Sequence, residues 1–478
     1  MFDEEKYFQK GAENYIYRIK SVPIGINICE DMYFPSGPAK IQSILGGAEL
    51  IINISASPYY IGKIEEREKI LCARAADNRV NIAYVNLTGG QDGLVFDGNS
   101  LIINEKGSIL ARAKPFQEDA LIYDLDTKKI QACRLQDTKL KNQKIKMEQS
   151  YAPLPVIDID NYKNTQRGDL QIKEGSNKKK KLKSSKFTNK YSQYISCREE
   201  ETLKALILAT QDYIIKNGFK KVVLGLSGGI DSALIAVIAV SAIGKSNVAA
   251  IMMPSIYSSQ ESIADARKLS LNLGIANITI PISTIYTSYI ENLREIFKCK
   301  EINVTKENIQ ARIRGNILMA AANENNWLVL STGNKSEISV GYCTLYGDMV
   351  GGFSPINDIY KTDVYNICKF INKKYSNLIP ERILTKAPSA ELKPGQKDED
   401  KLPPYSILDR ILRSYIEDEK DYSSIVKMGF DEKIVKDVIC MVDFNEYKRR
   451  QGTPGIKLTQ RAVSRERKYP ITNKFRLA

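Results

Sequence analysis

The stretch from Val222 to Ser232 reads Val-Val-Leu-Gly-Leu-Ser-Gly-Gly-Ile-Asp-Ser and decides the fold of the second half of the chain. An apolar, β-branched run stops at Gly228 and Gly229 and passes into the helix-like segment Ala233 to Ala239. Glycines lack a Cβ atom and let backbone N–H groups close around an anion, and the positive end of a helix dipole favours negative charge. The pattern therefore predicts a strand, a phosphate-binding loop and a helix in succession.

This loop differs from the common nucleoside-triphosphatase loop, in which a Lys precedes the final hydroxyl residue. Asp231 stands at that position here, and Ser232 follows it. A carboxylate beside bound phosphates indicates a Mg²⁺ ligand. An ordinary strand-to-helix turn would explain two glycines alone, whereas the full string from Ser227 favours the phosphate loop.

The hexapeptide Ser227 to Ser232 resembles the pyrophosphate-binding loop of the ATP pyrophosphatase enzymes. That family splits ATP between its α and β phosphates and includes synthetases for NAD, GMP and asparagine as well as tRNA-thiolating ligases. The resemblance implies the half-reaction and leaves the acceptor open.

Composition narrows the function classes. The chain has 478 residues, 43% of them hydrophobic, without a secretory signal or an apolar run of the ~18 residues that a membrane span requires. We therefore expect a soluble, cytoplasmic protein with two to four domains and no membrane partner. The eight cysteines form no C-x-x-C pair, which argues against zinc and against a disulfide framework. Histidine is absent, so any general base must be a carboxylate, Lys, Tyr or water.

The positive charge is concentrated in one segment. The net charge is +14, and residues 137–195 hold 14 Lys or Arg against 6 Asp or Glu, a difference of +8. This segment includes Lys178 to Lys181 among Asn, Ser and Gln, a composition typical of a solvated linker. The sequence therefore predicts a linker over 136–195 and no nucleic-acid partner.

Residues 1–135 alternate β-like runs with one helical pattern and predict an α/β domain. Cys29 ends the first of these runs, at the edge where sheets present nucleophiles, although a structural thiol is the alternative. The expected strands are Pro23 to Cys29, Leu50 to Ser55, Asn81 to Leu87, Ser100 to Asn104 and Ala120 to Leu125, and the expected helix is Glu65 to Asn78.

Several strings in this domain resemble the nitrilase-type glutaminase domain of glutamine-dependent NAD⁺ synthetases. They are Asn53 to Tyr59, Gly62-Lys63, Arg74 to Asn78, Gly89 to Asp92 and Val95 to Gly98. The resemblance implies an α-β-β-α sandwich in which Cys29 attacks the glutamine amide and Ser57 and Lys63 bind glutamine.

The family's glutaminase also uses a Glu base and a Lys that stabilises the tetrahedral oxyanion, and both precede a segment similar to Phe2 to Phe8. In this chain that segment begins at Met1, so we expect a partial sandwich with uncovered apolar strands. Loss of a general base lowers rates about 10²- to 10⁴-fold. Glutamine is therefore expected to be a poor nitrogen donor if the chain acts as written, with ammonia used instead.

Residues 196–478 alternate helices and strands and predict a doubly wound parallel sheet with its ligand at the strand C-terminal ends. The strand Leu328 to Ser331 opens on Thr332 to Glu337, a second loop suited to nucleotide contact. The other expected elements are helices Glu199 to Asn217, Ala233 to Ile243 and Glu261 to Leu273 and strands Val248 to Met253 and Asn277 to Pro281.

Further strings in this half resemble the synthetase domain of NAD⁺ synthetases. They are Glu307 to Gly315, Thr332 to Glu337, Gly341 to Asp348, Lys361 to Tyr365, Pro388 to Leu392, Leu402 to Tyr405 and Asn445 to Gln451. The resemblance implies ATP contacts at Gly225, Leu226, Ser227, Gly228, Gly229, Ile230, Asp231, Ser232, Thr332, Lys361 and Ser389. It implies Mg²⁺ at Asp231 and Glu337, and deamido-NAD⁺ at Asn308, Arg312, Glu337, Asp358 and Lys448.

The expected activity is ATP-dependent amidation of deamido-NAD⁺ through an acyl-adenylate, with release of AMP and pyrophosphate and with nitrogen from glutamine or ammonia. Two alternatives stay open, a tRNA-modifying ligase that shares the pyrophosphate loop and a non-catalytic fragment. In the resembled family synthetase domains pair, so a homo-oligomer is expected.

Overall fold

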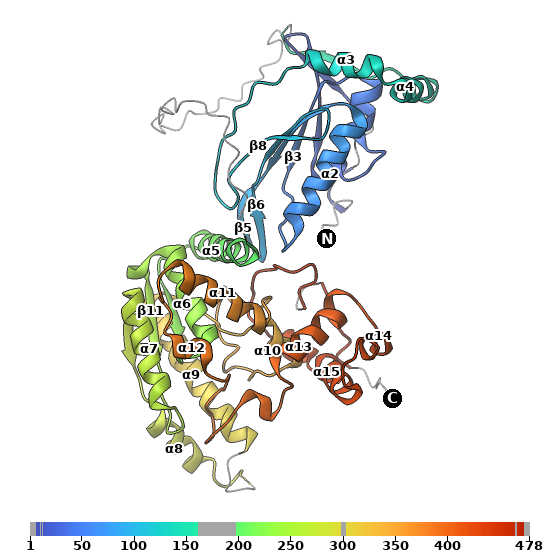
Figure 1. Cartoon of the computed structure of the whole chain (residues 1–478). Coiled ribbons are helices and arrows are strands. Elements are labelled where there is room, and N and C mark those ends of the chain that lie inside the picture. Colours follow the sequence, from blue (N-terminus) through green and yellow to red (C-terminus); the bar gives the residue numbers. More distant parts are fainter. Residues whose placement is uncertain are drawn as a thin grey trace. The chain divides into compact units, whose positions relative to one another are not determined.

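The computed structural model describes residues 6–9, 11, 13–160, 197–297, 303–463 and 466–472. The chain divides into two compact units (Figure 1). Unit 1 comprises Met1–Pro58, Gly62–Thr88 and Phe96–Tyr194, and unit 2 comprises Tyr59–Ile61, Gly89–Val95 and Ile195–Ala478. Two short segments from the N-terminal part of the sequence therefore belong to the C-terminal unit, which the sequence did not predict.

Unit 1 contains a seven-stranded sheet of order β8-β7-β4-β3-β2-β1-β9. Its strands are β1 (Ile16–Ile19), β2 (Val22–Ile28), β3 (Leu50–Ser55), β4 (Asn81–Asn86), β7 (Leu101–Ile103), β8 (Ile109–Arg112) and β9 (Val156–Asp158). The central strands β2, β3 and β4 are parallel. Four of the five predicted strands, those matching β2, β3, β4 and β7, are confirmed within two residues at either end.

One face of this sheet is packed and the other is largely open. Helix α2 (Lys63–Asn78) buries Leu71 and Ala75 against Ile51 and Ile82. Because successive side chains of a strand alternate between faces, the neighbouring apolar residues lie on the opposite side. There Ile28, Ile54 and Val85 are 67%, 55% and 50% exposed. Within the described residues, this face agrees with the expectation of uncovered apolar strands.

Residues 138–158 differ from the predicted linker. Helix α4 (Thr138–Ser150) follows helix α3 (Lys128–Gln136) and begins at Asp137, whose side chain accepts a hydrogen bond from the Leu140 N–H. Strand β9 then pairs in parallel with β1. The expected boundary at residue 135 is thus too early for the fold, because a capped helix and an edge strand extend unit 1. The Lys-rich run from Lys178 lies outside the described residues.

The strand expected at Ala120 to Leu125 does not form. Its residues are mainly hydrophobic, which favours a strand, but no neighbouring strand pairs with it among the described residues. Ile122 is exposed as a result.

Unit 2 contains a parallel four-stranded sheet of order β12-β11-β10-β13. The strands are β10 (Val222–Gly225), β11 (Val248–Met252), β12 (Ala276–Thr279) and β13 (Leu328–Leu330). The strand order places β10 in the middle, next to β11 on one side and β13 on the other. The predicted doubly wound parallel sheet is confirmed, and the loops after β10 and β13 lie at the same edge of the sheet.

Helices cover both faces of the second sheet. Helices α5 (Arg198–Lys216), α6 (Ile230–Ile243) and α11 (Lys361–Lys374) pack together on one side, and α7 (Gln260–Leu273) lies beside α6. Helices α8 (Ser283–Asn292) and α9 (Val304–Asn325) pack against Val223 and Ile251 on the other. Both faces are therefore closed, and the open space lies at the strand ends.

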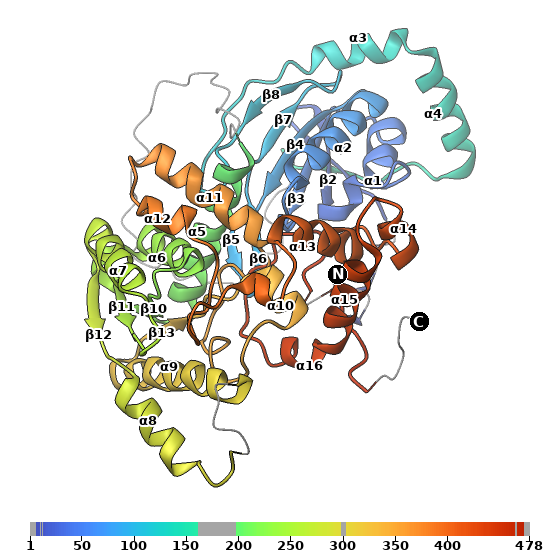
Figure 2. The same cartoon turned by 60° about the horizontal axis from the view of Figure 1, so that its bottom comes forward.

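A helical cluster follows the sheet in sequence. Helices α10 (Lys335–Val340), α13 (Tyr405–Leu412) and α15 (Glu432–Phe444) share a core that includes Val340, Leu408 and Val438 (Figure 2). Two further short helices of the unit are α12 (Glu381–Thr385) and α16 (Glu446–Arg449). Within the described ranges, no helix has the length and apolar character needed to cross a bilayer.

Candidate active site

The glycine loop between β10 and α6 has a backbone that only glycine can adopt at one point. Gly228 has φ +80°, and a Cβ atom there would lie 2.3 Å from the carbonyl oxygen of Ser262. The Gly229 N–H donates to Ser227 Oγ at 3.1 Å, and the Ser227 and Ser232 hydroxyls lie 3.1 Å apart. The loop thus presents N–H and hydroxyl donors at the N-terminus of α6, as an oxyanion site requires.

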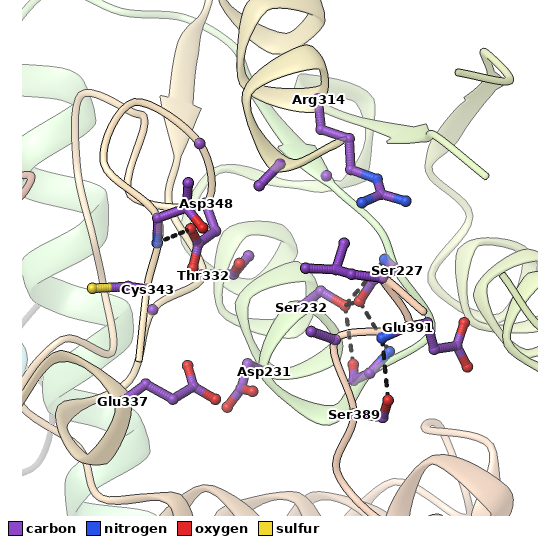
Figure 3. A pocket seen from close by; sticks show the side chains of 18 of the residues that line it. Ser227, Asp231, Ser232, Arg314, Thr332, Glu337, Cys343, Asp348, Ser389 and Glu391 are labelled. Atoms are coloured by element: carbon purple, nitrogen blue, oxygen red, sulfur yellow. Dashed lines mark hydrogen bonds between the residues drawn. The ribbon is translucent and has the colours of Figure 1, made fainter. Parts of the chain in front are cut away.

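This loop forms one wall of a cavity of about 490 Å³ (Figure 3). That volume lies within the range of small-molecule sites. All eleven residues predicted to contact ATP line the cavity, namely Gly225 to Ser232, Thr332, Lys361 and Ser389. Of the residues predicted to bind deamido-NAD⁺, Asn308, Glu337 and Lys448 line it as well.

Lys361 lies between the two predicted metal ligands. Its ammonium group is 2.5 Å from Asp231 Oδ2 and 3.0 Å from Glu337 Oε1. Asn334, which caps α10, donates from its side chain to Asp231 at 3.2 Å and accepts from the Glu337 N–H. The two predicted nucleotide loops therefore meet through one buried lysine.

Burial and neighbouring charges together set the pKa values of Glu337 and Lys361. Desolvation raises the pKa of Glu337 to about 7, although the nearby Lys361 charge acts in the opposite direction. The paired carboxylates of Asp231 and Glu337 raise the pKa of Lys361, which outweighs the lowering effect of burial. The lysine is consequently cationic, and it holds the carboxylate oxygens at the cavity wall.

Helix α9 contributes a different arginine from the one predicted. Asn308, Ala311, Arg314 and Gly315 line the cavity, whereas Arg312 is exposed and its Nε donates to the Leu345 carbonyl. Residues three and four apart share a helix face, so the face of Asn308 carries position 311 and then 314 or 315. Helical spacing could therefore have favoured Arg314, and the structure does not place Arg312 in the pocket.

Asp358, also predicted to bind deamido-NAD⁺, is a buried structural residue. Its carboxylate accepts from the N–H groups of Leu458 and Thr459 and pairs with the fully buried Lys335 at 2.9 Å. It does not line the cavity. The Asp358 side chain therefore holds the chain segment around Thr459. These two residues are 101 positions apart, so no local motif could have predicted their contact.

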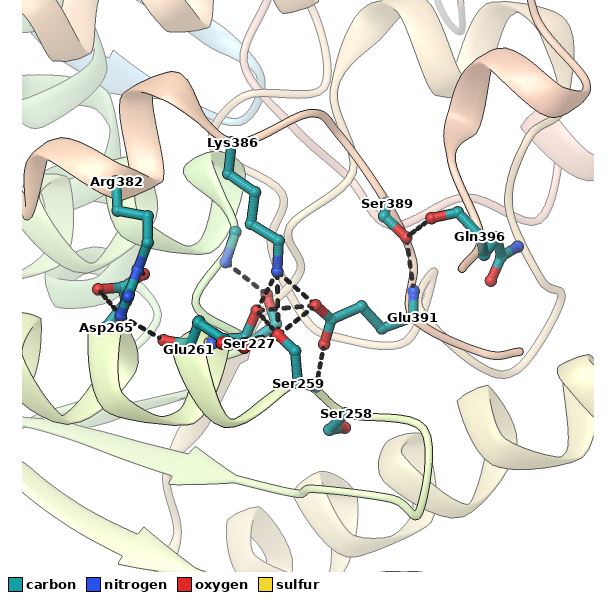
Figure 4. Close-up of polar contacts among 12 residues, drawn as sticks. Ser227, Ser258, Ser259, Glu261, Asp265, Arg382, Lys386, Ser389, Glu391 and Gln396 are labelled. Atoms are coloured by element: carbon teal, nitrogen blue, oxygen red, sulfur yellow. Dashed lines mark hydrogen bonds and ion pairs between the residues drawn. The ribbon is translucent and has the colours of Figure 1, made fainter. Parts of the chain in front are cut away.

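The segment after α12 closes another side of the cavity (Figure 4). Glu391 accepts from the Ser259 N–H at 3.1 Å, from the Ser262 hydroxyl at 2.8 Å and from Lys386 Nζ at 2.5 Å. The Ser389 hydroxyl donates to the Gln396 carbonyl and accepts from the Glu391 N–H. Glu391 therefore fixes the predicted ATP residue Ser389 relative to α7. Neither Lys386 nor this role of Glu391 was predicted from the sequence.

Cys29 follows β2 in unit 1 with strained backbone. Its φ is +42°, in the left-handed region that non-glycine residues seldom adopt, and its carbonyl accepts a hydrogen bond from the buried Asn53 side chain. Such outliers are concentrated at functional sites, where the surrounding structure enforces them. This geometry is compatible with a nucleophile at a strand end.

The predicted glutamine-binding residues Ser57 and Lys63 are joined through Tyr33. The Tyr33 and Ser57 hydroxyls lie 3.3 Å apart, and Lys63 Nζ lies 4.8 Å from the centre of the Tyr33 ring. The Ser57 N–H donates to the side-chain oxygen of Asn86 at 2.9 Å. The structure thus brings Ser57 and Lys63 to one place.

A fully buried ion pair lies beside Asn86, which holds the Ser57 backbone. Arg67 donates two hydrogen bonds to Asp97, at 2.8 and 2.9 Å, and neither side chain is accessible to solvent. Asp97 also accepts from Asn86, the residue that holds the Ser57 backbone. The Asp97 charge raises the pKa of Arg67 against the lowering effect of burial.

The chain thus combines a glycine loop of the pyrophosphate-binding type, at the edge of a parallel sheet, with a separate unit that carries a strand-end cysteine. Family models agree with both parts. The carbon-nitrogen hydrolase model matches residues 1–135, and the NAD synthase model matches residues 202–452. The chain belongs to the NAD synthase family and, with its hydrolase domain, to the glutamine-dependent NAD(+) synthetases, which are ligases.

Individual relatives cover the whole chain. It is 46% identical to the glutamine-dependent NAD(+) synthetase of Thermotoga maritima over 477 residues, which are 100% of this chain and 79% of that protein. The corresponding protein of Aquifex aeolicus is 44% identical over 99% of this chain and 79% of its own length. These relatives lend no support to the tRNA-modifying ligase or to the non-catalytic fragment.

A solved structure gives the same result. The glutamine-dependent NAD+ synthetase from Acinetobacter baumannii, in complex with adenosine diphosphate, is 38% identical and matches with a TM-score of 0.66. The match covers 99% of this chain and 76% of that one. The expected fold class, α/β with a nitrilase-like domain followed by an ATP pyrophosphatase-type domain, is confirmed.

Proposed function

We propose that the chain converts deamido-NAD⁺ into NAD⁺, using ATP and a nitrogen atom from glutamine or ammonia. The observation that carries this proposal is the cavity in which the glycine loop, Lys361 and Ser389 converge. The named relatives, which are glutamine-dependent NAD(+) synthetases, support it.

The residues present fit a Mg²⁺ ion held jointly with substrate phosphates. No group of three or more Asp, Glu, Cys or His suited to a metal occurs within the described residues. Mg²⁺ keeps several waters and commonly takes only one or two carboxylates beside the phosphates of its nucleotide. Asp231 and Glu337 supply those two, next to the phosphate loop. When bound there, the ion would neutralise charge on the departing pyrophosphate.

In the first step we propose that the nicotinate carboxylate of deamido-NAD⁺ attacks the α-phosphorus of ATP. An oxygen–phosphorus bond forms, the bond to the bridging oxygen breaks, and pyrophosphate leaves. The N–H groups around Gly229 and the Ser227 and Ser232 hydroxyls would bind the leaving group, and the Lys361 ammonium would offset its charge.

In the second step ammonia attacks the acyl carbon of the adenylate, AMP departs with the bonding electron pair, and the nitrogen loses a proton to water or to a wall carboxylate. Ammonia is already nucleophilic and AMP is a good leaving group. Positioning and charge stabilisation therefore suffice, which is consistent with a chain without histidine.

Unit 1 would supply the ammonia. We propose that the Cys29 thiolate attacks the side-chain amide of glutamine, releases ammonia and leaves a thioester that water hydrolyses. Ser57 and Lys63 would hold the glutamine, in keeping with their shared contact to Tyr33. Assembly as a homo-oligomer through unit 2 and a cytoplasmic location also belong to this proposal.

Product analysis tests the proposal. The purified chain is incubated with ATP, Mg²⁺, deamido-NAD⁺ and ammonium, and nucleotides and phosphates are separated by chromatography. We expect NAD⁺, AMP and pyrophosphate in equal amounts. Formation of ADP and orthophosphate would contradict the mechanism.

A further inference from the structure

Five cationic side chains line the cavity, and three of them are paired with carboxylates. Lys361 contacts Asp231 and Glu337, Lys386 contacts Glu391, and Lys401 contacts Glu307 at 3.1 Å. The charges of these three lysines are therefore compensated within the protein. They stabilise the cavity wall before any substrate is bound.

The other two cations, Lys448 and Arg314, donate only to backbone carbonyls in the described part of the chain. Lys448 Nζ donates to the carbonyls of Gly341 and Cys343 at 2.7 and 2.9 Å. Arg314 Nε donates to the carbonyl of Met253 at 3.1 Å. Lys448 was predicted to bind deamido-NAD⁺, whereas Arg314 was given no role in the sequence analysis.

The position of Arg314 relates it to the phosphate loop. Figure 3 shows its side chain descending from α9 toward the side of the cavity with Ser227 and Glu391, while Cys343 and Glu337 lie on the other side. Its partner Met253 directly follows β11, the strand beside β10. The Arg314 guanidinium thus lies on the nucleotide side of the cavity.

Among the described residues, no carboxylate forms an ion pair with the Arg314 guanidinium. Burial lowers the pKa of Arg314 to about 10, and the Glu391 charge acts in the opposite direction. Glu391, however, is already engaged by Lys386 and two serine hydroxyls. An arginine presents five N–H donors in a planar fork that matches the oxygens of a phosphate. Arg314 has one of these five committed to protein.

We propose that Arg314 binds a phosphate oxygen of the adenine nucleotide and is a substrate-binding residue of the synthetase reaction. This inference rests on the proposed function for the identity of the nucleotide. The guanidinium N–H groups of Arg314 would bind phosphate oxygens whose negative charge the glycine loop does not neutralise alone. Arg314 would then contact the phosphates in addition to the glycine loop at the N-terminus of α6.

Binding measurements without turnover test this role. Titration calorimetry with pyrophosphate and with AMP as separate probes is carried out on the wild-type chain, Arg314→Gln and Arg314→Lys. The matched control is Arg267→Gln, which removes an exposed arginine of α7. A lost charge-assisted hydrogen bond weakens binding about 10- to 100-fold. We expect that loss in Arg314→Gln, a smaller loss in Arg314→Lys, and no change in the control.

The probe that loses affinity identifies the phosphate. A loss confined to pyrophosphate assigns Arg314 to the β and γ phosphates, and a loss confined to AMP assigns it to the α phosphate. Unchanged affinity of a folded Arg314→Gln variant for both probes overturns the inference. If Arg314→Gln has a lowered melting temperature, unchanged affinity of Arg314→Lys for both probes overturns it instead. A wild-type chain that binds both probes but makes no NAD⁺ would contradict the proposed function and not this role.

Discussion

The Nζ atom of Lys361 lies 2.5 Å from Oδ2 of Asp231, although the two residues are separated by 130 positions in the sequence. Asp231 belongs to the first turn of α6, and Lys361 belongs to the first turn of α11. The contact joins the glycine loop to the segment that carries the lysine. It holds both the charge that would meet the leaving pyrophosphate and the carboxylate that would meet the metal.

Asp231→Asn should abolish NAD⁺ formation and leave the fold intact. The amide keeps the side-chain volume and can accept from Asn334, but it removes a ligand charge beside the phosphates. We expect kcat to fall at least ~10²-fold, with the folded circular dichroism spectrum retained because Glu337 remains as a carboxylate partner of the buried Lys361. Asp418→Asn, which changes an exposed carboxylate, is the control. Full activity of Asp231→Asn would exclude a role in catalysis.

Asp358→Asn should act on stability and not on substrate affinity. The substitution leaves the buried ammonium of Lys335 with Glu417 as its remaining carboxylate partner. Breaking a buried pair costs about 3–5 kcal/mol, and Glu417 should keep the loss near the lower figure, about 3 kcal/mol. Urea unfolding measures the loss. If KM for deamido-NAD⁺ rose in the folded variant while stability held, the substrate-binding role predicted from the sequence would be restored.

The two arginines of α9 show what sequence could and could not provide. The resemblance of the string Glu307 to Gly315 marked this segment for substrate contact, but the choice between Arg312 and Arg314 depends on which helix face meets the cavity. Local signals were strong at the glycine loop, where backbone shape is encoded by glycine itself. They were absent for Asp358 and Glu391, whose partners lie 101 and 132 positions away. The predicted strand at Ala120 failed for a similar reason, since a hydrophobic run does not by itself supply a neighbouring strand.

Glu391→Gln should raise KM for ATP more than it lowers kcat. The neutral amide can still accept hydrogen bonds from Ser259 and Ser262 but loses the ion pair with Lys386. The segment that carries Ser389 would then be held less firmly against α7. We expect KM for ATP to rise about 3- to 10-fold, equivalent to one weakened charged hydrogen bond. Steady-state kinetics with Glu399→Gln, an exposed neighbour, as control checks this, and equal KM values would contradict it.

Asp97→Asn should impair unit 1 while sparing ammonia-driven synthesis. The substitution leaves the Arg67 guanidinium buried without its anion, at a cost of about 3–5 kcal/mol, and weakens the Asn86 contact that holds Ser57. Hydrogen exchange should show lost protection in α2 and β4. Protection unchanged from the wild type would show that the pair contributes little to this unit.

Cys29→Ala separates the two nitrogen sources. If Cys29 is the nucleophile, its removal should eliminate NAD⁺ formation from glutamine, because no thioester can form. Ammonia-driven synthesis should stay within about twofold of the wild type, since Cys29 and the synthetase cavity belong to different units. The measurement is the ratio of glutamine-driven to ammonia-driven NAD⁺ formation by the 478-residue chain and by the variant.

The matched control is Cys72→Ala in α2, a thiol whose pKa is raised by burial and which is therefore less reactive at neutral pH. This variant should keep the wild-type ratio. Glutamine-driven synthesis that persists in Cys29→Ala would show that the strained backbone at Cys29 has a structural cause. A wild-type ratio near zero, with Cys29→Ala changing neither rate, would instead match the expectation that Cys29 lacks the base and the oxyanion donor on which a glutaminase depends.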